Sequence, residues 1–313
     1  MSEVPAPSAD DYRVLGRRLS NWGRWGVEDE LGTLNLIGDA ERVRAAGLIR
    51  TGTQIALGLP LGAEGPQGPY SERDNLVHVM TRLGDTVPSA SGYVFTDDLV
   101  VMYPQGSTQI DGLAHVGYDG RLYNDHPLST VTRSGAQQLG IEAMIAGIQG
   151  RGVLLDIPRF RQTDALPADA AISPDDLEAC AQSQDVQIGR GDILLVRTGW
   201  MATYLRDGDG QRYLTHEPGL TLACATWLQD RDIAFLASDN YGVEIVPAED
   251  PSVDFPLHSV LIRDMGMPLG EMFVLDELAR ACADSQRWEF FFSCLPLPIV
   301  GGVGSPIAPV AIL

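Results

Sequence analysis

Short runs of apolar residues recur along the chain, most of them bounded by glycine, proline or charged residues. The runs at 151–158, 192–198 and 233–239 are almost continuously apolar. Strands buried on both faces have this pattern, because neither face then needs polar side chains. Further strands are predicted at 54–59, 93–95, 98–103 and 288–294, and we expect the strand at 98–103 to be buried.

Helices are predicted between these runs. The ranges are 39–49, 130–148, a helix that opens at 173, and 221–229. Ser173 is a suitable N-cap because Pro174 and acidic residues follow it, and Asp39 is the expected N-cap of the first helix. Helices that alternate with short apolar strands favour an α/β fold, with a mixed central sheet and flanking helices.

The length of 313 residues allows about two domains at roughly 150 residues each, yet the chain shows no linker and no internal repeat. We therefore expect a flexible N-terminal arm at 1–10 and a single domain at 11–313. The stretch 295–309 is rich in proline and glycine, and we expect an extended tail that packs on the body.

The charge balance excludes several functions. The chain carries 22 basic and 42 acidic residues, a formal net charge of −20. Clustered cations are needed to bind nucleic acid or anionic membranes, so we expect neither partner. All the basic residues are arginine, so Schiff-base chemistry, a pyridoxal phosphate lysine and a Walker A loop are excluded.

The cysteines and the apolar segments indicate the cellular compartment. The four cysteines contain no CxxC pair, which argues against a cysteine zinc site or a redox motif. The first twenty residues lack the apolar stretch of a signal peptide, and no apolar run approaches the length of a membrane span. We therefore expect a cytoplasmic protein with reduced cysteines.

The densest polar cluster is the segment 105–115, with the sequence QGSTQIDGLAH. In an extended chain, the side chains of Gln109 and Asp111 point to the same face, where they could converge on one ion. His115 follows four residues later. The alternative is a polar loop with a capping aspartate and a surface histidine.

A second cluster lies in an otherwise apolar stretch. His258 and Glu271 both have apolar neighbours, and a buried carboxylate needs a cation or several hydrogen bonds to stay ionised. A metal ion is one such partner. The alternative is a core histidine beside a glutamate that pairs with Arg263 or Arg197. The other three histidines, at positions 78, 126 and 216, are interpreted as surface residues.

With these motifs the chain resembles the metal-dependent cyclase family, which includes bacterial kynurenine formamidases, isatin hydrolases and trans-dienelactone hydrolases. The family signature HxGTHxDxPxH aligns with 105–115. Further matching segments are NWGRWG at 21–26, GRGVLLD at 150–156, VRTG at 196–199, SDNYGVE at 238–244 and GGVGSP at 301–306. The resemblance implies a swivelling β/β/α-type domain.

The resemblance also assigns roles to individual residues. The two metal-binding histidines of the signature are replaced by Gln105 and Gln109, whereas the aspartate is present as Asp111. The last histidine, the family's catalytic acid/base, is His115. The distal metal-site pair of the family matches His258 and Glu271. Amide and carboxylate oxygens favour manganese over zinc, so one divalent ion (Mn or Zn) is expected.

These residues predict a metal-dependent hydrolase. Metal-activated water would cleave an amide, lactam or lactone bond of a small, cyclic or aromatic substrate, with His115 as general acid/base. One alternative is a metal-free cyclase, lyase or isomerase of secondary metabolism that uses His115 and Asp111. Another is a non-catalytic binding protein of the same fold.

Three aromatic residues are candidates for substrate binding, and the chain is expected to form an oligomer. Trp22, Trp25 and Tyr241 could stack on an aromatic or flat substrate, although core or interface packing would explain them equally well. The resemblance further implies a homo-oligomer, a dimer or tetramer, whose N-terminal residues reach a neighbour's site.

Overall fold

A nine-stranded mixed sheet forms the centre of the computed structural model, which describes residues 11–69, 71–84 and 91–313. The sheet order is β1-β15-β13-β7-β9-β11-β12-β4-β14. Four neighbouring strands are parallel, namely β7 (Ile148–Asp156), β9 (Ile193–Arg197), β11 (Phe235–Ser238) and β12 (Leu269–Glu271). The outer strands are β1 (Gln54–Ala56), β15 (Val310–Ile312), β13 (Glu289–Cys294), β4 (Gln109–Asp111) and β14 (Gly304–Pro306). The predicted α/β class with a mixed sheet is therefore confirmed.

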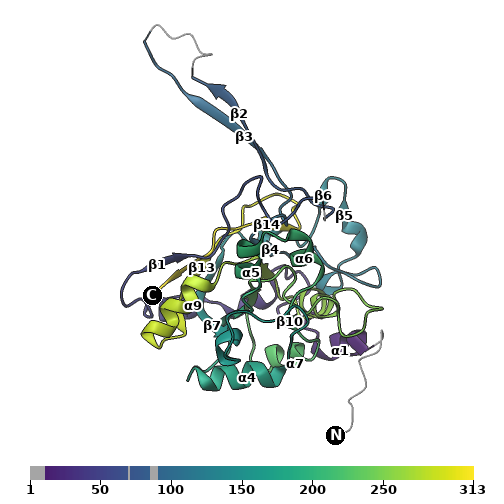
Figure 1. The fold of residues 1–313 in the computed structure, drawn as a ribbon. Helices are drawn as coiled ribbons and strands as arrows, with labels where there is room; N and C mark the ends of the chain where they lie inside the picture. The colour runs from purple at the N-terminus through teal and green to yellow at the C-terminus, as the bar shows by residue number, and fades with distance from the viewer. Residues whose placement is uncertain (1–10, 70, 85–90) are drawn as a thin grey trace.

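Helices cover the parallel strands, as Figure 1 shows, and this cover explains why those strands are continuously apolar. The longer helices are α1 (Asp11–Leu19), α2 (Asp39–Ala46), α4 (Pro174–Ser183), α5 (Trp200–Asp207), α6 (Gly210–Thr215), α7 (Cys224–Asp230) and α9 (Asp276–Ser285). The short ones are α3 (Ile157–Phe160), α8 (Pro256–His258), a π-helix at Ser259–Asp264, and 3₁₀ turns at Gly32–Leu36, Tyr123–Asp125, Leu128–Thr130 and Ile141–Met144. Two small sheets pair β8 (Ala171–Ile172) with β10 (Gly219–Leu220) and β5 (Val131–Thr132) with β6 (Gly135–Ala136).

Capping decides where two of these helices begin. Ser173 caps α4 as predicted, and its hydroxyl and backbone exchange hydrogen bonds with Asp176. The N-cap of α2 is Gly38, not Asp39, because the Glu41 carboxylate accepts the backbone N–H of Gly38 at 2.9 Å. Asp39 is instead the first residue of the helix, where its charge still complements the helix dipole.

The helix expected at 130–148 is wrong. This segment forms β5, β6 and one 3₁₀ turn before β7 starts at Ile148. Gly135 and Gly147 have φ values of 113° and 76°, and Leu139 has a φ of 61°. These left-handed positions interrupt any continuous helix, so the favourable composition of the segment is overridden.

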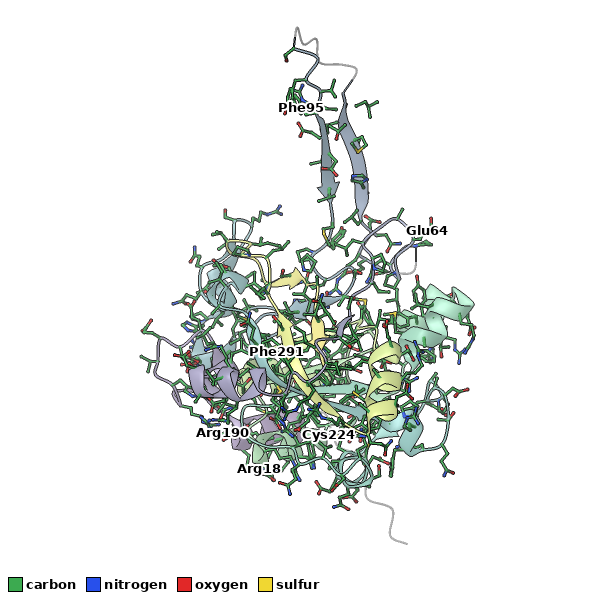
Figure 2. All side chains as sticks on the ribbon, turned by 90° about the vertical axis from the view of Figure 1, so that its left-hand side faces the viewer. Arg18, Glu64, Phe95, Arg190, Cys224 and Phe291 are labelled. Atoms are coloured by element: carbon green, nitrogen blue, oxygen red, sulfur yellow. The ribbon has the colours of Figure 1, made fainter. Side chains whose placement is uncertain are left out.

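A two-stranded hairpin projects from the body, formed by β2 (Val77–Leu83) and β3 (Thr96–Val101) (Figures 1 and 2). Every side chain of both strands is exposed. The strand predicted at 98–103 therefore exists in part, but the expectation that it is buried is wrong. No strand forms at 93–95, where one was predicted, because β3 begins only at Thr96. The expected N-terminal arm at 1–10 lies outside the described residues.

The tail that follows β13 contributes β14 and β15 to the main sheet. All four cysteines are free and buried, as expected. Of the other histidines, His78 and His216 are exposed as predicted, whereas His126 is buried and its Nδ1 lies 2.8 Å from the Gln138 amide oxygen. Among the described residues, no helix has both the length and the hydropathy to cross a bilayer.

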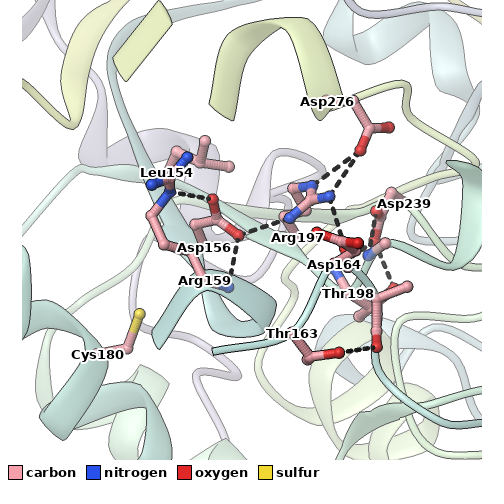
Figure 3. A network of polar contacts seen from close by, with 12 residues as sticks. Leu154, Asp156, Arg159, Thr163, Asp164, Cys180, Arg197, Thr198, Asp239 and Asp276 are labelled. Atoms are coloured by element: carbon pink, nitrogen blue, oxygen red, sulfur yellow. Dashed lines mark hydrogen bonds and ion pairs between the residues drawn. The ribbon is translucent and has the colours of Figure 1, made fainter. Parts of the chain in front are cut away.

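A network of ion pairs fixes the carboxyl ends of the parallel strands (Figure 3). Arg197, at the end of β9, donates to Asp156 at the end of β7 and to Asp276 at the start of α9, each at 2.7 Å. Next to it, the buried Asp239 accepts hydrogen bonds from Thr198 and from the backbone N–H of Gly199. These contacts hold the loop that follows β11 and leads to the cavity described below.

Candidate active site

Strand pairing brings the two polar clusters of the sequence together. β4 and β12 are antiparallel, so that Gln109 lies opposite Glu271 and Asp111 opposite Leu269. The Gln109 amide donates a hydrogen bond to Glu271 Oε2. Because side chains alternate along a strand, Asp111 lies on the same face as Gln109. The register thus places three side-chain groups from segments about 160 residues apart on one side of the sheet.

Glu244 positions His258 on this face. The Glu244 carboxylate accepts the backbone N–H groups of Leu257 and His258, at 3.0 and 2.7 Å, and lies 2.7 Å from His258 Nδ1. The other ring nitrogen, Nε2, lies 2.9 Å from Glu271 Oε1. Burial alone would lower the pKa of His258, but its hydrogen bonds to the two carboxylates raise it well above the usual value.

The resulting cluster has the composition of a metal site. One ligand atom each of Asp111, His258 and Glu271 lie within 4.8 Å of one another, and all three residues are buried. Two further acceptors, Gln109 Oε1 and Asp111 Oδ1, are buried and have no hydrogen-bond partner among the described residues. Buried acceptors normally have a partner, and oxygen atoms of this kind are ligands for hard divalent cations. The donor set therefore fits a divalent ion.

The electrostatics of Asp111 support the same conclusion. Burial, reinforced by the nearby Glu271 charge and opposed mainly by His115, raises the pKa of Asp111 to about 6. A carboxyl group with a raised pKa lacks compensation for its charge. A cation beside it would supply that compensation.

Gln105 approaches the cluster from the turn that precedes β4. A Cβ atom built on Gly304 would lie only 2.5 Å from Gln105 Nε2, so the amide occupies the space of a missing side chain. Gly304 pairs with Asp111 in the register of β14 and β4, and directly paired residues share a face. The Gln105 amide nitrogen is buried without a hydrogen-bond partner among the described residues. Gln105 thus lies next to Asp111, and its role as a metal ligand stays a prediction.

His115 lies at the open side of the cluster. Its Nε2 is 3.7 Å from Asp111 Oδ1, which is too long for a hydrogen bond, and its side chain is about one quarter exposed. It borders a cavity of about 190 Å³, which is lined by Arg73, Asp111, His115, Val116, Tyr241, Gly242, Phe255, His258 and Glu271. His115 can therefore contact a molecule in the cavity.

Arg73 is a cavity residue that the sequence did not single out. Its Nη1 donates to the backbone oxygen of Gln105 at 3.1 Å and to the Tyr241 hydroxyl at 3.3 Å. No carboxylate of the described residues lies within ion-pair distance of it. One arginine among 22 basic residues gives no signal in the sequence. Glu244 was not singled out either, although it lies in the 238–244 segment.

Tyr241 is the predicted aromatic residue that reaches the cavity. Its backbone N–H and that of Gly242 both donate to the buried Glu217 carboxylate. Burial raises the pKa of its hydroxyl, so the ring stays neutral. Glu217, which fixes this loop, is a further residue that sequence reasoning missed.

The two tryptophans are not part of the cavity lining within the described chain. Trp22 Nε1 donates to the backbone oxygen of Arg263 at 2.8 Å, and the Arg263 guanidinium lies 4.6 Å from the Trp22 ring. Trp25 packs under Arg24, 4.8 Å from its guanidinium. Their predicted contact with substrate stays a prediction.

The alternative ion pairs for Glu271 are wrong. Arg263 pairs with Asp264, and Arg197 pairs with the two aspartates of the network in Figure 3. Glu271 is bonded instead by Gln109 and His258. The alternative of a capping Asp111 is also wrong, because both of its neighbouring strands, β12 and β14, pair with it inside the sheet.

The chain is similar to proteins that are already known. The Cyclase family model matches residues 55–245. A solved structure described as a novel cyclase is 37% identical, with 94% of this chain and 99% of that chain covered and a TM-score of 0.87. No curated protein matches the chain significantly.

Two further solved structures share the fold at lower identity. Isatin hydrolase A from Ralstonia solanacearum is 22% identical, with 86% of this chain and 93% of that chain covered and a TM-score of 0.61. A protein from Bacillus stearothermophilus described as a predicted metal-dependent hydrolase is 16% identical, with 83% of this chain and 97% of that chain covered and a TM-score of 0.52.

Proposed function

Because this chain belongs to the cyclase family, we propose that it is a metal-dependent hydrolase that opens an amide, lactam or lactone bond of a small cyclic or aromatic substrate. One observation carries the proposal. The cluster of Asp111, His258 and Glu271 borders the same cavity as His115. An isatin hydrolase shares the fold, and isatin is a cyclic amide.

The residues that would hold the ion are those with unpartnered or carboxylate oxygens. These are Gln109, Asp111 and Glu271, with Gln105 and His258 beside them. An oxygen-rich set favours manganese over zinc. When bound, a divalent ion would polarise a carbonyl group and lower the pKa of a coordinated water toward about 7.

His115 would then move the protons. Its Nε2 takes a proton from the attacking water and later returns it to the leaving nitrogen or oxygen. The Asp111 carboxylate, 3.7 Å from this nitrogen, would stabilise the protonated ring by charge attraction. The chain contains no GxSxG nucleophile motif, which agrees with direct attack by water.

Arg73 and the aromatic residues would bind the substrate. The Arg73 guanidinium, which has no carboxylate partner among the described residues, can pair with a carboxylate of the substrate or with the oxyanion that develops during hydrolysis. Tyr241 and Phe255 offer ring surfaces to a flat molecule. The cavity of about 190 Å³ is below the usual range for drug-sized ligands, which favours a small substrate.

A metal-free enzyme is the second candidate, and one observation favours it. Both Glu271 oxygens already accept hydrogen bonds, from Gln109 and His258, and both His258 nitrogens face carboxylates. These groups satisfy one another without an ion. Asp111 and His115 would then transfer protons in a cyclisation, elimination or isomerisation.

A turnover assay separates the two candidates. Isatin, an N-formyl arylamine and an aromatic lactone are offered to protein that has been treated with a chelator and dialysed. Hydrolysis of at least one compound that appears only after MnCl₂ is added supports the metal-dependent hydrolase. Hydrolysis that survives chelation contradicts the role of the metal, and no hydrolysis of any compound contradicts the substrate class.

A further inference from the structure

The Tyr241 side chain belongs to both the core and the cavity. Its ring packs against a buried cluster of large side chains, made of Trp200, Met201, Tyr213 and Met272. Its hydroxyl oxygen accepts a hydrogen bond from Nη1 of Arg73, another residue of the cavity lining, at 3.3 Å. The ring is thus held by the fold, while its polar end borders the space in which a substrate would lie.

The Tyr241 hydroxyl is free to donate a hydrogen bond. A phenol oxygen can accept hydrogen bonds and donate one of its own. The Tyr241 oxygen accepts from Arg73, and within the described part of the chain no acceptor takes its proton. Burial raises the pKa of this hydroxyl, so it keeps the proton at neutral pH. The cavity therefore contains a neutral donor whose hydrogen bond is not yet made.

Arg73 strengthens this donor. A hydroxyl that accepts a hydrogen bond gives a stronger one, because neighbouring hydrogen bonds polarise one another. Arg73 also donates to the backbone oxygen of Gln105 at 3.1 Å, and it has no carboxylate partner among the described residues. A neutral hydroxyl and a positive guanidinium thus lie side by side at the cavity, the kind of donor pair that stabilises a negative oxygen.

A buried carboxylate fixes the backbone at Tyr241. Glu217 is only 1% exposed, and its two oxygens accept the backbone N–H groups of Tyr241 and Gly242. A Cβ atom built on Gly242 would lie 2.8 Å from Phe255 Cε1, so this loop has no room to shift toward that ring. Donors that are held in place before the reaction need no reorganisation when charge develops. The Tyr241 hydroxyl meets this condition.

We propose that the Tyr241 hydroxyl is a catalytic hydrogen-bond donor that, together with Arg73, stabilises the oxyanion formed on the carbonyl oxygen of the substrate. This inference rests on the proposed hydrolase function and deepens it. The water oxygen forms a bond to the carbonyl carbon, a proton of the water passes to His115, and the π electrons of the C=O bond move to its oxygen. When the C=O bond forms again, the bond to the leaving nitrogen or oxygen breaks, and His115 returns the proton to that atom. Tyr241 keeps its own proton throughout.

The alternative is that Tyr241 offers only its ring to a flat substrate. Tyr241→Phe separates the two roles, because it keeps the ring and removes the hydroxyl. Tyr204 provides a matched control, Tyr204→Phe. It lies on α5 and packs against the same buried cluster, with its ring centroid 5.0 Å from that of Tyr213, but it is not part of the cavity lining in the described chain.

The first measurement is binding of 4-nitrophenol to chelator-treated protein. Absorbance distinguishes the neutral phenol from the phenolate, so titrations at several pH values give a dissociation constant for each form. The phenolate carries its negative charge on one oxygen, as the oxyanion does. Tyr241→Phe should bind the phenolate about 10- to 100-fold more weakly than the wild type, the loss of one charge-assisted hydrogen bond. Its affinity for the neutral phenol should stay within about threefold, and Tyr204→Phe should bind both forms as the wild type does.

The second measurement uses a compound of the panel that the wild type hydrolyses. Tyr241→Phe should lower kcat about a hundredfold and leave KM within about threefold, because the hydroxyl bonds an oxygen whose charge develops only in the transition state. A ring that only stacks on the substrate would leave kcat unchanged in this variant. Tyr204→Phe should keep the wild-type kcat, and circular dichroism should show native secondary structure in both variants.

Each remaining outcome decides the proposal. Equal phenolate affinity in wild type and Tyr241→Phe overturns it, as does a wild type that binds no phenolate. An unchanged kcat in Tyr241→Phe overturns the catalytic role even where phenolate binding is weakened. If phenolate binding depends on Tyr241 as expected but the wild type hydrolyses no compound, the hydroxyl is supported as a donor to anions and the proposed hydrolysis is contradicted.

Discussion

Gln109 and Glu271 face each other across β4 and β12, and the amide of the first donates a hydrogen bond to the carboxylate of the second. This pairing depends on strand register. A slip of one residue would turn Gln109 and Asp111 to the other face of the sheet, away from Glu271. The composition of the site is therefore fixed by the backbone pairing of two short strands.

Replacement of His115 tests the proton-transfer role. His115→Ala should lower kcat by about a hundredfold to ten-thousandfold with native secondary structure, because the general acid/base is lost. The assay uses whichever compound of the lactam, lactone and formamide panel the wild type hydrolyses. His216→Ala, at an exposed position, is the control. A His115→Ala enzyme with a wild-type rate would refute the assignment.

The raised pKa of Asp111 predicts a pH dependence of stability in the metal-free protein. Burial raises this pKa to about 6, whereas an unfolded chain titrates near 3.9. The folded state thus binds the proton more tightly, and the free energy of unfolding should fall as pH rises from about 4 to 6.

Asp111→Asn should remove this fall, because an amide does not titrate. At pH 7 and without metal, the variant should be more stable than the wild type, by on the order of 3 kcal/mol at most. Urea unfolding at several pH values measures the difference, and Asp284→Asn, at an exposed position, controls for the loss of one charge. Parallel pH profiles for wild type and Asp111→Asn would contradict the prediction.

Replacement of Arg73 tests whether the cavity receives an anion. Benzoate serves as the probe, because it combines a carboxylate with a flat ring. Arg73→Gln should weaken benzoate binding about 10- to 100-fold, the loss of one charge-assisted contact, and Arg73→Lys should recover part of it. Arg206→Gln, at an exposed position on α5, is the control. Equal affinities in calorimetric titrations of wild type and Arg73→Gln would exclude this role.

Local patterns in the sequence identified most of the sheet. The buried strands around Leu154, Leu195 and Leu236 follow directly from continuous apolar runs, and Ser173 marks the start of α4. The helix predicted at 130–148 was wrong because the composition of this segment favours a helix, whereas the left-handed backbone at Gly135 and Leu139 excludes one. The predicted burial of the strand at 98–103 was wrong because the exposure of a strand depends on what it packs against, which the local sequence does not encode.

In the candidate site, too, local patterns predicted some residues and missed those that depend on tertiary contacts. The sequence singled out Gln109, Asp111 and His115 from their spacing, and His258 and Glu271 from their apolar surroundings. It did not identify Arg73, which reaches the cavity from a loop before the hairpin, or Glu217 and Glu244, whose contacts are made far from their positions in the chain. Those residues act through tertiary contacts, and no local pattern marks such contacts.

Calorimetric titration of MnCl₂, and in parallel ZnCl₂, into chelator-treated protein tests the central proposal most directly. The account predicts binding of one ion per chain, with affinity reduced at least tenfold in Asp111→Asn and in Glu271→Gln and unchanged in Asp284→Asn. A wild-type protein that binds neither ion, or whose binding is unaffected by Asp111→Asn and Glu271→Gln, would contradict it.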